Sequence, residues 1–239
     1  MNLIDRAIFV FNIQATMKRS EVNRKIEEAL TFFNSMNFHL PPWGYWSPGQ
    51  WKQNKGECRE IIENNLGWDL TDFGSGDFLN KGLILFTLRN GNPENDQKTY
   101  AEKIMIVEED QVTPTHFHWK KMEDIINRGG GNLVIELFPS DENERIADHS
   151  FEVSIDGIRR SFGPGDRVIL TPGESITLYQ GLYHNFYGET GKGKVLVGEV
   201  SSVNDDQADN NFLEGVRFPE ILEDVYPEHL LVGDYTTFT

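Results

Sequence analysis

LILFTLR, residues 83–89, is the first of a series of short apolar runs that decides the fold class. The runs are rich in β-branched and aromatic residues, and turn signals separate them. The others are EKIMIVEE (102–109), NLVIELF (132–138), FEVSIDG (151–157), DRVILTPG (166–173), SITLYQG (175–181) and KVLVGEVSSV (194–203). No long helical pattern lies between them, which argues against a parallel α/β fold. The pattern predicts an all-β sandwich or barrel over residues 81–239.

The residues upstream of this series have a helical pattern. Apolar side chains recur at helical spacing over residues 20–36, and Ser20 is the expected N-cap. Pro41 and Pro42 end that pattern, and Ser47 followed by Pro48 predicts the start of a short helix.

A further helix is expected over residues 56–65, with Gly67 as its terminator. We therefore predict a helical arm over residues 17–80 that packs on the β domain. Residues 1–16 remain as an N-terminal extension, for which no fixed structure is predicted.

Composition excludes several classes of partner. The chain has 22 basic and 38 acidic side chains and a net charge of −16, without a lysine or arginine cluster. Such a surface repels phosphate groups, so we expect neither nucleic acid nor an anionic membrane as a partner. The single cysteine, Cys58, cannot form an intrachain disulfide, and the apolar run at residues 7–13 is too short to span a membrane. A cytoplasmic protein is expected.

The segment THFHWKKMEDIINRGGGN (115–132) carries a candidate metal site. On a strand, His116 and His118 point to the same side, and Glu123 is far enough along the chain to lie on a neighbouring strand. A glycine turn at Gly181 delivers His184 as a fourth ligand. This donor set suits a divalent ion such as Mn, Fe, Zn or Ni. The alternative is an ordinary surface or core pair of histidines, and spacing alone leaves both interpretations open.

The same segment resembles the first cupin motif, which runs His-x-His, three or four residues, Glu, six residues, Gly. His116, His118, Glu123 and Gly130 match it, although Asp110 stands where the family has its leading glycine. The second cupin motif is matched by Gly173, Gly181 and His184. Its usual proline and asparagine are replaced by Tyr179 and Gly188, which are turn positions and not ligands. The resemblance implies a cupin double-stranded β-helix, or jelly roll.

A closer resemblance, to the cupin-type D-lyxose isomerases, covers nearly the whole chain from Met17. The stretches that carry it are HLPPW (39–43), LGWDLTDFG (66–74), LFTLRNG (85–91), YAEKIMIV (100–107), QVTPTHFHW (111–119), EDIINRGGGNL (123–133), LTPGESI (170–176), GLYH (181–184) and VLVGEVSSVNDD (195–206). It implies interconversion of D-lyxose with D-xylulose and of D-mannose with D-fructose. It also implies Mn²⁺ as the preferred ion, with Co²⁺, Fe²⁺ or Zn²⁺ as other divalent candidates, a monosaccharide substrate and a homodimer.

Aldose–ketose isomerisation moves a proton between C2 and C1 through an enediol, and it needs a base beside the metal. Glu199 and Lys103 lie in otherwise apolar strands, so each faces either the barrel lumen or solvent. We assign Glu199 as the proton carrier and Lys103 as the group that stabilises negative charge on a sugar oxygen, and both as substrate contacts. Asp205, Asp206 and Asp209 are candidate ligands for sugar hydroxyls, with a solvated loop as the alternative.

Two other functions fit the same ligands. A cupin oxidase or dioxygenase holds Fe or Mn with three histidines and a glutamate but needs no acid–base pair. A non-catalytic sugar-binding cupin needs no complete ligand set. A buried Glu199 beside the metal favours the isomerase.

Overall fold

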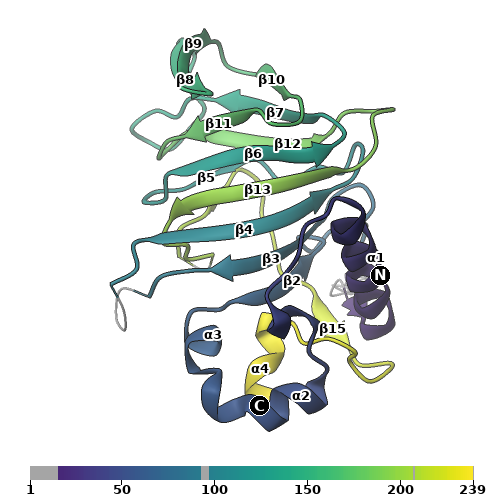
Figure 1. Cartoon of the computed structure of the whole chain (residues 1–239). Helices are drawn as coiled ribbons and strands as arrows, with labels where there is room; N and C mark the ends of the chain where they lie inside the picture. The colour runs from purple at the N-terminus through teal and green to yellow at the C-terminus, as the bar shows by residue number, and fades with distance from the viewer. Residues whose placement is uncertain (1–15, 93–96, 207, 239) are drawn as a thin grey trace, which may run out of the picture.

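The computed structural model describes residues 16–92, 97–206 and 208–238 of the chain. They form two facing β-sheets, with helices below one end and along one outer face (Figure 1). In the described residues, no helix is both long enough and apolar enough to cross a membrane. The predicted extension over residues 1–16 lies outside the described residues except for Thr16, which begins the first strand.

Helices are confined to the two ends of the chain, and strands fill the middle. The helical elements are α1 (Arg19–Ser35), η1 (Pro42–Tyr45), α2 (Pro48–Asn54), η2 (Lys55–Glu57), α3 (Arg59–Glu63), η3 (Val232–Asp234) and α4 (Tyr235–Phe238). The strands are β1 (Thr16–Lys18), β2 (Gly67–Thr71), β3 (Leu83–Arg89), β4 (Tyr100–Val107), β5 (His116–Phe117), β6 (Glu123–Gly130), β7 (Leu133–Phe138), β8 (Phe151–Ile155), β9 (Ile158–Phe162), β10 (Asp166–Leu170), β11 (Ser175–Leu178), β12 (Tyr183–Gly188), β13 (Val195–Ser202), β14 (Asn211–Phe212) and β15 (Glu220–Leu222).

The eight-stranded sheet has the order β2-β3-β4-β13-β6-β11-β8-β9, and the five-stranded sheet has the order β10-β7-β12-β5-β14. Neighbouring strands in both sheets are antiparallel, while β1 and β15 form a separate parallel pair. Strands far apart in sequence are neighbours, as in β4-β13-β6, which is the connectivity of two sheets wound together. The predicted all-β jelly roll with an N-terminal helical arm is confirmed.

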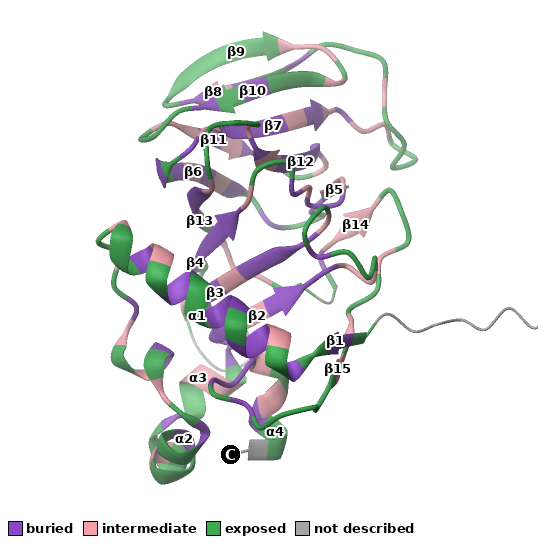
Figure 2. Cartoon of the chain, turned by 90° about the vertical axis from the view of Figure 1, so that its right-hand side faces the viewer, coloured by how far each residue is buried: buried purple, intermediate pink, exposed green. Residues whose placement is uncertain are grey.

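The alternation of side chains along β4 and β13 separates two apolar cores. Met105 and Val197 point into the lumen, by which we mean the space between the two sheets, and pack there with residues of both sheets. Ile104 and Leu196 point the other way and pack against the apolar stripe of α1. Figure 2 shows α1 lying across the outer face of the sheet with its exposed side turned to solvent. Because α1 covers this outer face, both faces of the central strands are buried.

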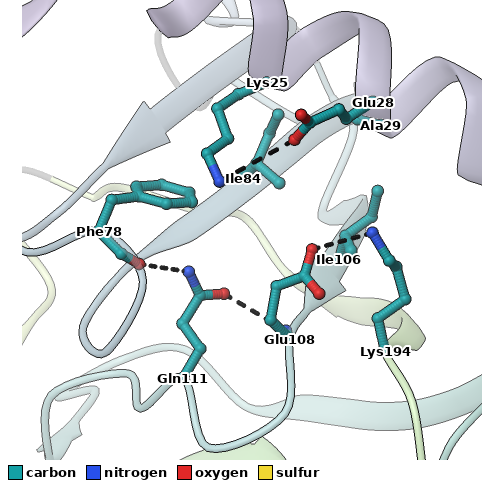
Figure 3. Close-up of a pocket in the computed structure, with 9 residues that line it drawn as sticks. All are labelled: Lys25, Glu28, Ala29, Phe78, Ile84, Ile106, Glu108, Gln111 and Lys194. Atoms are coloured by element: carbon teal, nitrogen blue, oxygen red, sulfur yellow. Dashed lines mark hydrogen bonds and ion pairs between the residues drawn. The ribbon is translucent and has the colours of Figure 1, made fainter.

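A small hollow remains between α1 and the sheet, about 10 Å³ in volume (Figure 3). Lys25 lies over the ring of Phe78 there, and Gln111 donates to the Phe78 carbonyl. Glu108 forms an ion pair with Lys194 at its edge. A volume this small holds at most about one water molecule, so the hollow is a packing defect and no sugar site.

The arm differs from its prediction at two points. Lys18, not Ser20, is the N-cap of α1, and its side chain forms no cap bond; Ser20 instead bonds Asp224. Gly67 does not merely end a helix but begins β2 with φ +125°, so the eight-stranded sheet starts inside the region predicted as the arm. The predicted cap at Ser47 is confirmed, with a capping box to Gln50.

Candidate metal centre

Three histidines converge on the lumen from the five-stranded sheet. His116 in β5 and His184 in β12 are direct cross-strand partners, and His118 lies two residues beyond His116. Their ligand nitrogens lie within 4.8 Å of one another, and His118 and His184 are buried. The fold thus brings together histidines from both sequence motifs.

Each ring is held by a hydrogen bond from Nδ1 to a backbone carbonyl. The partners are Pro114 for His116 at 2.8 Å, Asp209 for His118 at 2.9 Å and Leu182 for His184 at 3.0 Å. A ring nitrogen that faces a carbonyl oxygen carries the proton, so Nε2 of each ring keeps its lone pair. Among the described residues, Nε2 of His118 and Nε2 of His184 are buried without a hydrogen-bond partner.

Glu123, at the start of β6, faces these nitrogens from the opposite sheet. Its Oε1 lies 3.1 Å from Nε2 of His184 and 3.4 Å from Nε2 of His118. Burial alone would raise the pKa of Glu123, but the ammonium group of Lys121, followed by His118, holds it well below its ordinary range. The carboxylate is therefore ionised.

These four side chains fit a divalent cation. Burial, followed by the rings of His184 and His118, holds the pKa of His116 well below its ordinary value, so the ring is neutral and can act as a ligand. Buried nitrogens without a partner carry a large desolvation cost, which coordination would remove. Imidazole nitrogens with one carboxylate are a common set for first-row divalent metals.

Lys121 was not predicted, although it is the most central cation of the site. Its Nζ lies 2.7 Å from Oε2 of Glu123 and 2.9 Å from Oε1 of Glu199, and the residue is 3% exposed. Burial would lower the pKa of Lys121, but Glu123 and Glu199 together raise it above the ordinary value. One signal was available in the sequence: Lys121 and Glu123 are two residues apart, the same spacing as His116 and His118.

Lys103 and Glu199 are cross-strand partners on β4 and β13, and both side chains are buried. They share the lumenal face with Met105 and Val197, and Nζ of Lys103 lies 3.9 Å from Oε1 of Glu199. Lys103 also donates to Oδ1 of Asn204 at 2.7 Å. The structure therefore places both residues inside the barrel, and not on a solvated face.

The loop after β13 contributes its three aspartates in three different ways. Asp206 accepts from Lys103 at 3.2 Å. The Asp206 side chain is 47% exposed, so the burial that would raise its pKa is only partial, and Lys103 and then Lys121 lower that pKa to about 2. Asp205 is exposed, and its Oδ1 accepts from the Ala208 N–H. Both carboxylate oxygens of Asp209 bind backbone N–H groups.

Phe212 is another residue that the sequence did not indicate. It pairs with His116 across β14 and β5, and the two ring centroids lie 5.2 Å apart. The C-terminal segment therefore packs an aromatic ring against one of the three histidines.

Two relatives of known activity match most of the chain. They are the D-lyxose/D-mannose isomerase of Serratia proteamaculans and the protein of the same name from Escherichia coli O157:H7. Each is 50% identical over 226 residues, which is 93% of this chain. The match covers 99% of the first protein and 100% of the second.

A solved structure confirms the architecture at much lower identity. The L-ribose isomerase of Geodermatophilus obscurus superposes with a TM-score of 0.60 at 15% identity, covering 87% of this chain and all of that one. Likeness at this identity shows a shared fold. The family model described as D-lyxose isomerase matches residues 17–235. From this match and the 50% identity of the two relatives, the chain belongs to the D-lyxose isomerase family.

Proposed function

We propose that this protein is a divalent-metal-dependent aldose–ketose isomerase that interconverts D-lyxose with D-xylulose and D-mannose with D-fructose. One observation carries the proposal. Three converging histidines and the carboxylate of Glu123 share the lumen with a second buried carboxylate, Glu199, and the buried ammonium group of Lys121 contacts both carboxylates. Ligands and acid–base groups thus meet in one lumen.

The reaction needs a base that takes the C2 proton and returns it to C1. When bound, the metal would polarise the sugar carbonyl and stabilise negative charge on its oxygens. The protein itself would supply the proton carrier and further cations around the same oxygens.

Glu199 has the geometry of that carrier. Its contacts with Lys121, Ser201 and Lys103 are all made through Oε1. Among the described residues, Oε2 makes no hydrogen bond, so this oxygen remains available to a substrate C–H. The three Oε1 contacts fix the carboxylate, and one oxygen acting on both carbons suits a proton that moves between neighbouring atoms.

Lys121 and Lys103 would stabilise the enediol stage electrostatically. Lys121 bridges Glu123 and Glu199, so it fixes the distance between the carboxylate that would bind the metal and the carboxylate that would carry the proton. Lys103 lies 3.9 Å from the same oxygen of Glu199, and its ammonium group would donate to a sugar oxygen. Asp206 orients Lys103 and would bind sugar hydroxyls together with it.

We further propose Mn²⁺ as the native ion, because it accepts mixed imidazole and carboxylate ligands in octahedral geometry. Co²⁺, Fe²⁺ and Zn²⁺ are the competitors to test. A cytoplasmic homodimer is proposed as the working form, and light scattering that gave a monomer mass at working concentration would remove the dimer.

The deciding experiment incubates the Mn²⁺-loaded protein with D-lyxose and with D-mannose while ketose and dissolved oxygen are both measured. An isomerase forms ketose without oxygen uptake and stops when a chelator is added. Oxygen uptake would favour a cupin oxidase or dioxygenase instead. Sugar binding without either product would favour a binding protein.

A further inference from the structure

Asp209 is tied to the metal centre at three points, although it comes from the loop between β13 and β14. Its Oδ1 accepts from the Lys120 N–H and its Oδ2 from the Lys121 N–H, both at 2.8 Å. Its backbone carbonyl accepts from Nδ1 of His118 at 2.9 Å. The residue is 4% exposed.

These contacts control two different groups of the site. The bond to His118 fixes the tautomer that leaves Nε2 free toward the lumen. The two bonds to the 120–121 backbone hold the turn from which Lys121 reaches Glu123 and Glu199. One residue therefore orients both a metal ligand and the cation beside the proposed base.

The same turn is held on its other side by the loop before β12. Gly181 donates to the His118 carbonyl at 3.0 Å, and the Gln180 side chain donates to the Lys120 carbonyl at 2.9 Å. Among the described residues, this second loop binds the turn only through these two carbonyl groups. The two amide N–H groups at 120 and 121 take both carboxylate oxygens of Asp209 as acceptors.

We propose that Asp209 is a positioning residue that couples metal affinity to the placement of Lys121. This replaces our expectation that it binds a sugar hydroxyl, because its carboxylate is buried and both oxygens already accept backbone N–H groups. Only a carboxylate offers two acceptors here. An asparagine would turn its NH₂ group toward one of the two backbone donors and release that part of the turn.

The test compares Asp209→Asn with Asp72→Asn as a matched control. Asp72 is 3% exposed and also binds two backbone amides, those of Gly74 and Gly76, through its two oxygens. It therefore reports the cost of losing a buried carboxylate of this kind elsewhere in the fold. For each protein the measurements are the melting temperature, the Mn²⁺ dissociation constant from the EPR signal of free Mn²⁺, and kcat at saturating Mn²⁺.

Asp209→Asn keeps the backbone carbonyl that binds His118 but releases the 120–121 turn, so both that carbonyl and Lys121 lose their fixed position. We expect Mn²⁺ binding to weaken by about 10-fold, the lower end of the effect of losing an outer partner of a metal ligand. The kcat of Asp209→Asn at saturating Mn²⁺ should also fall, while Asp72→Asn changes only the melting temperature. An Mn²⁺ dissociation constant of Asp209→Asn within about twofold of wild type would overturn the proposal, whatever happened to stability.

The kcat readout rests on the proposed isomerase activity, but the Mn²⁺ titration does not. If wild type showed no turnover, the proposed function would fail and the titration would still decide the role of Asp209.

If Asp209→Asn does not fold, hydrogen exchange measured on the wild-type protein takes the place of the variant. Since coupling is reciprocal, Mn²⁺ should slow exchange of the Asp209 N–H, which donates to the Asp205 carbonyl. Unchanged exchange would overturn the proposal.

Discussion

The Arg19 guanidinium and the Lys121 ammonium group are both buried and each bridges two carboxylates, but the two clusters differ in what surrounds them. The Arg19 guanidinium, fully buried at the start of α1, forms paired bonds with Glu223 and Asp234 of the C-terminal segment. The Lys121 ammonium bridges Glu123 and Glu199 in the lumen. The first cluster is closed by its own bonds. The second lies beside Nε2 of His118 and Nε2 of His184, which are buried and make no hydrogen bond to the described residues.

The difference separates a structural cluster from a functional one. The contacts of Arg19 with Glu223 and Asp234 join the two ends of the chain and hold the C-terminal segment in place. The planar guanidinium group presents donors that match the two carboxylates. The lumen instead leaves buried lone pairs unsatisfied, which costs stability unless a ligand binds. Changes at the Arg19 cluster should therefore affect folding, and changes in the lumen should affect metal and chemistry.

The largest effect is expected from removing a metal ligand. His184→Ala deletes one of the imidazoles and leaves Glu123 with fewer partners in the lumen. Bound metal and turnover should be lost together, which metal analysis after gel filtration and a ketose assay would measure. His149, on an exposed loop, gives the control His149→Ala, which should keep both. Full turnover by a metal-free His184→Ala protein would sink the assignment.

The next largest effect is expected at the base. Glu199→Gln keeps the shape of the side chain but removes its basicity, so kcat should fall about 10²- to 10⁴-fold. Metal content should stay near wild type, because Glu199 is not among the four proposed ligands. The exposed Glu152→Gln is the control for a change of charge alone. Near wild-type turnover by Glu199→Gln would move the role to Lys103 or to Asp206.

Much of the fold and part of the candidate site could be predicted from the sequence, and what could not be predicted has a physical reason. Strands such as the one at residues 83–89 were predictable because a short run of apolar and β-branched residues is visible in the local sequence. The convergence of His116, His118 and His184 was foreseeable because two sequence motifs carry these histidines. Lys121 was missed because its role depends on Glu199, 78 residues further along the chain, and its spacing from Glu123 does not by itself indicate that contact.

The C-terminal segment shows the same limit. Nothing near Asp209 indicates that its carboxylate binds the 120–121 backbone, since an aspartate in a polar loop normally faces solvent. Arg19 is similar, because a cation next to a predicted helix start suggests a surface residue, yet its partners lie beyond residue 220. Only the folded topology brings these pairs together.

The third prediction breaks the structural cluster. Arg19→Ala leaves Glu223 and Asp234 without their cation, and it should lower the free energy of unfolding by about 3 kcal/mol. This is the lower end for a buried pair, because the Glu223 side chain is half exposed. Denaturant unfolding with and without Mn²⁺ should give the same loss, since distant sites add.

The exposed Arg159→Ala serves as its control and should leave stability near wild type. A loss of metal affinity in Arg19→Ala would contradict the separation of the two clusters, because it would mean that the C-terminal fastening also sets the geometry of the lumen.

The smallest effect is expected at Asp69, a carboxylate on β2 at the edge of the lumenal charges. Burial, followed by the charge of Asp206, raises its pKa from 3.8 to about 6, although Lys103 acts in the opposite direction. Below about pH 4 the folded and unfolded chains are both protonated at this position. As the pH rises through about 6, the folded chain must hold a charge that its surroundings disfavour, so stability falls.

Asp69→Asn removes this cost and keeps the bond from the Leu70 N–H to the side-chain oxygen. Metal-free protein carrying the change should gain about 1–2 kcal/mol in the free energy of unfolding near pH 8 and nothing near pH 4. Two pKa units alone would correspond to about 3 kcal/mol, but the side chain is only partly buried and water screens it. A gain of equal size at both pH values would show that the substitution acts through packing. No gain at pH 8 would show that Lys103 already neutralises the Asp69 carboxylate. The ionised Asp69 would then cost no stability, like the carboxylates that pair with Arg19.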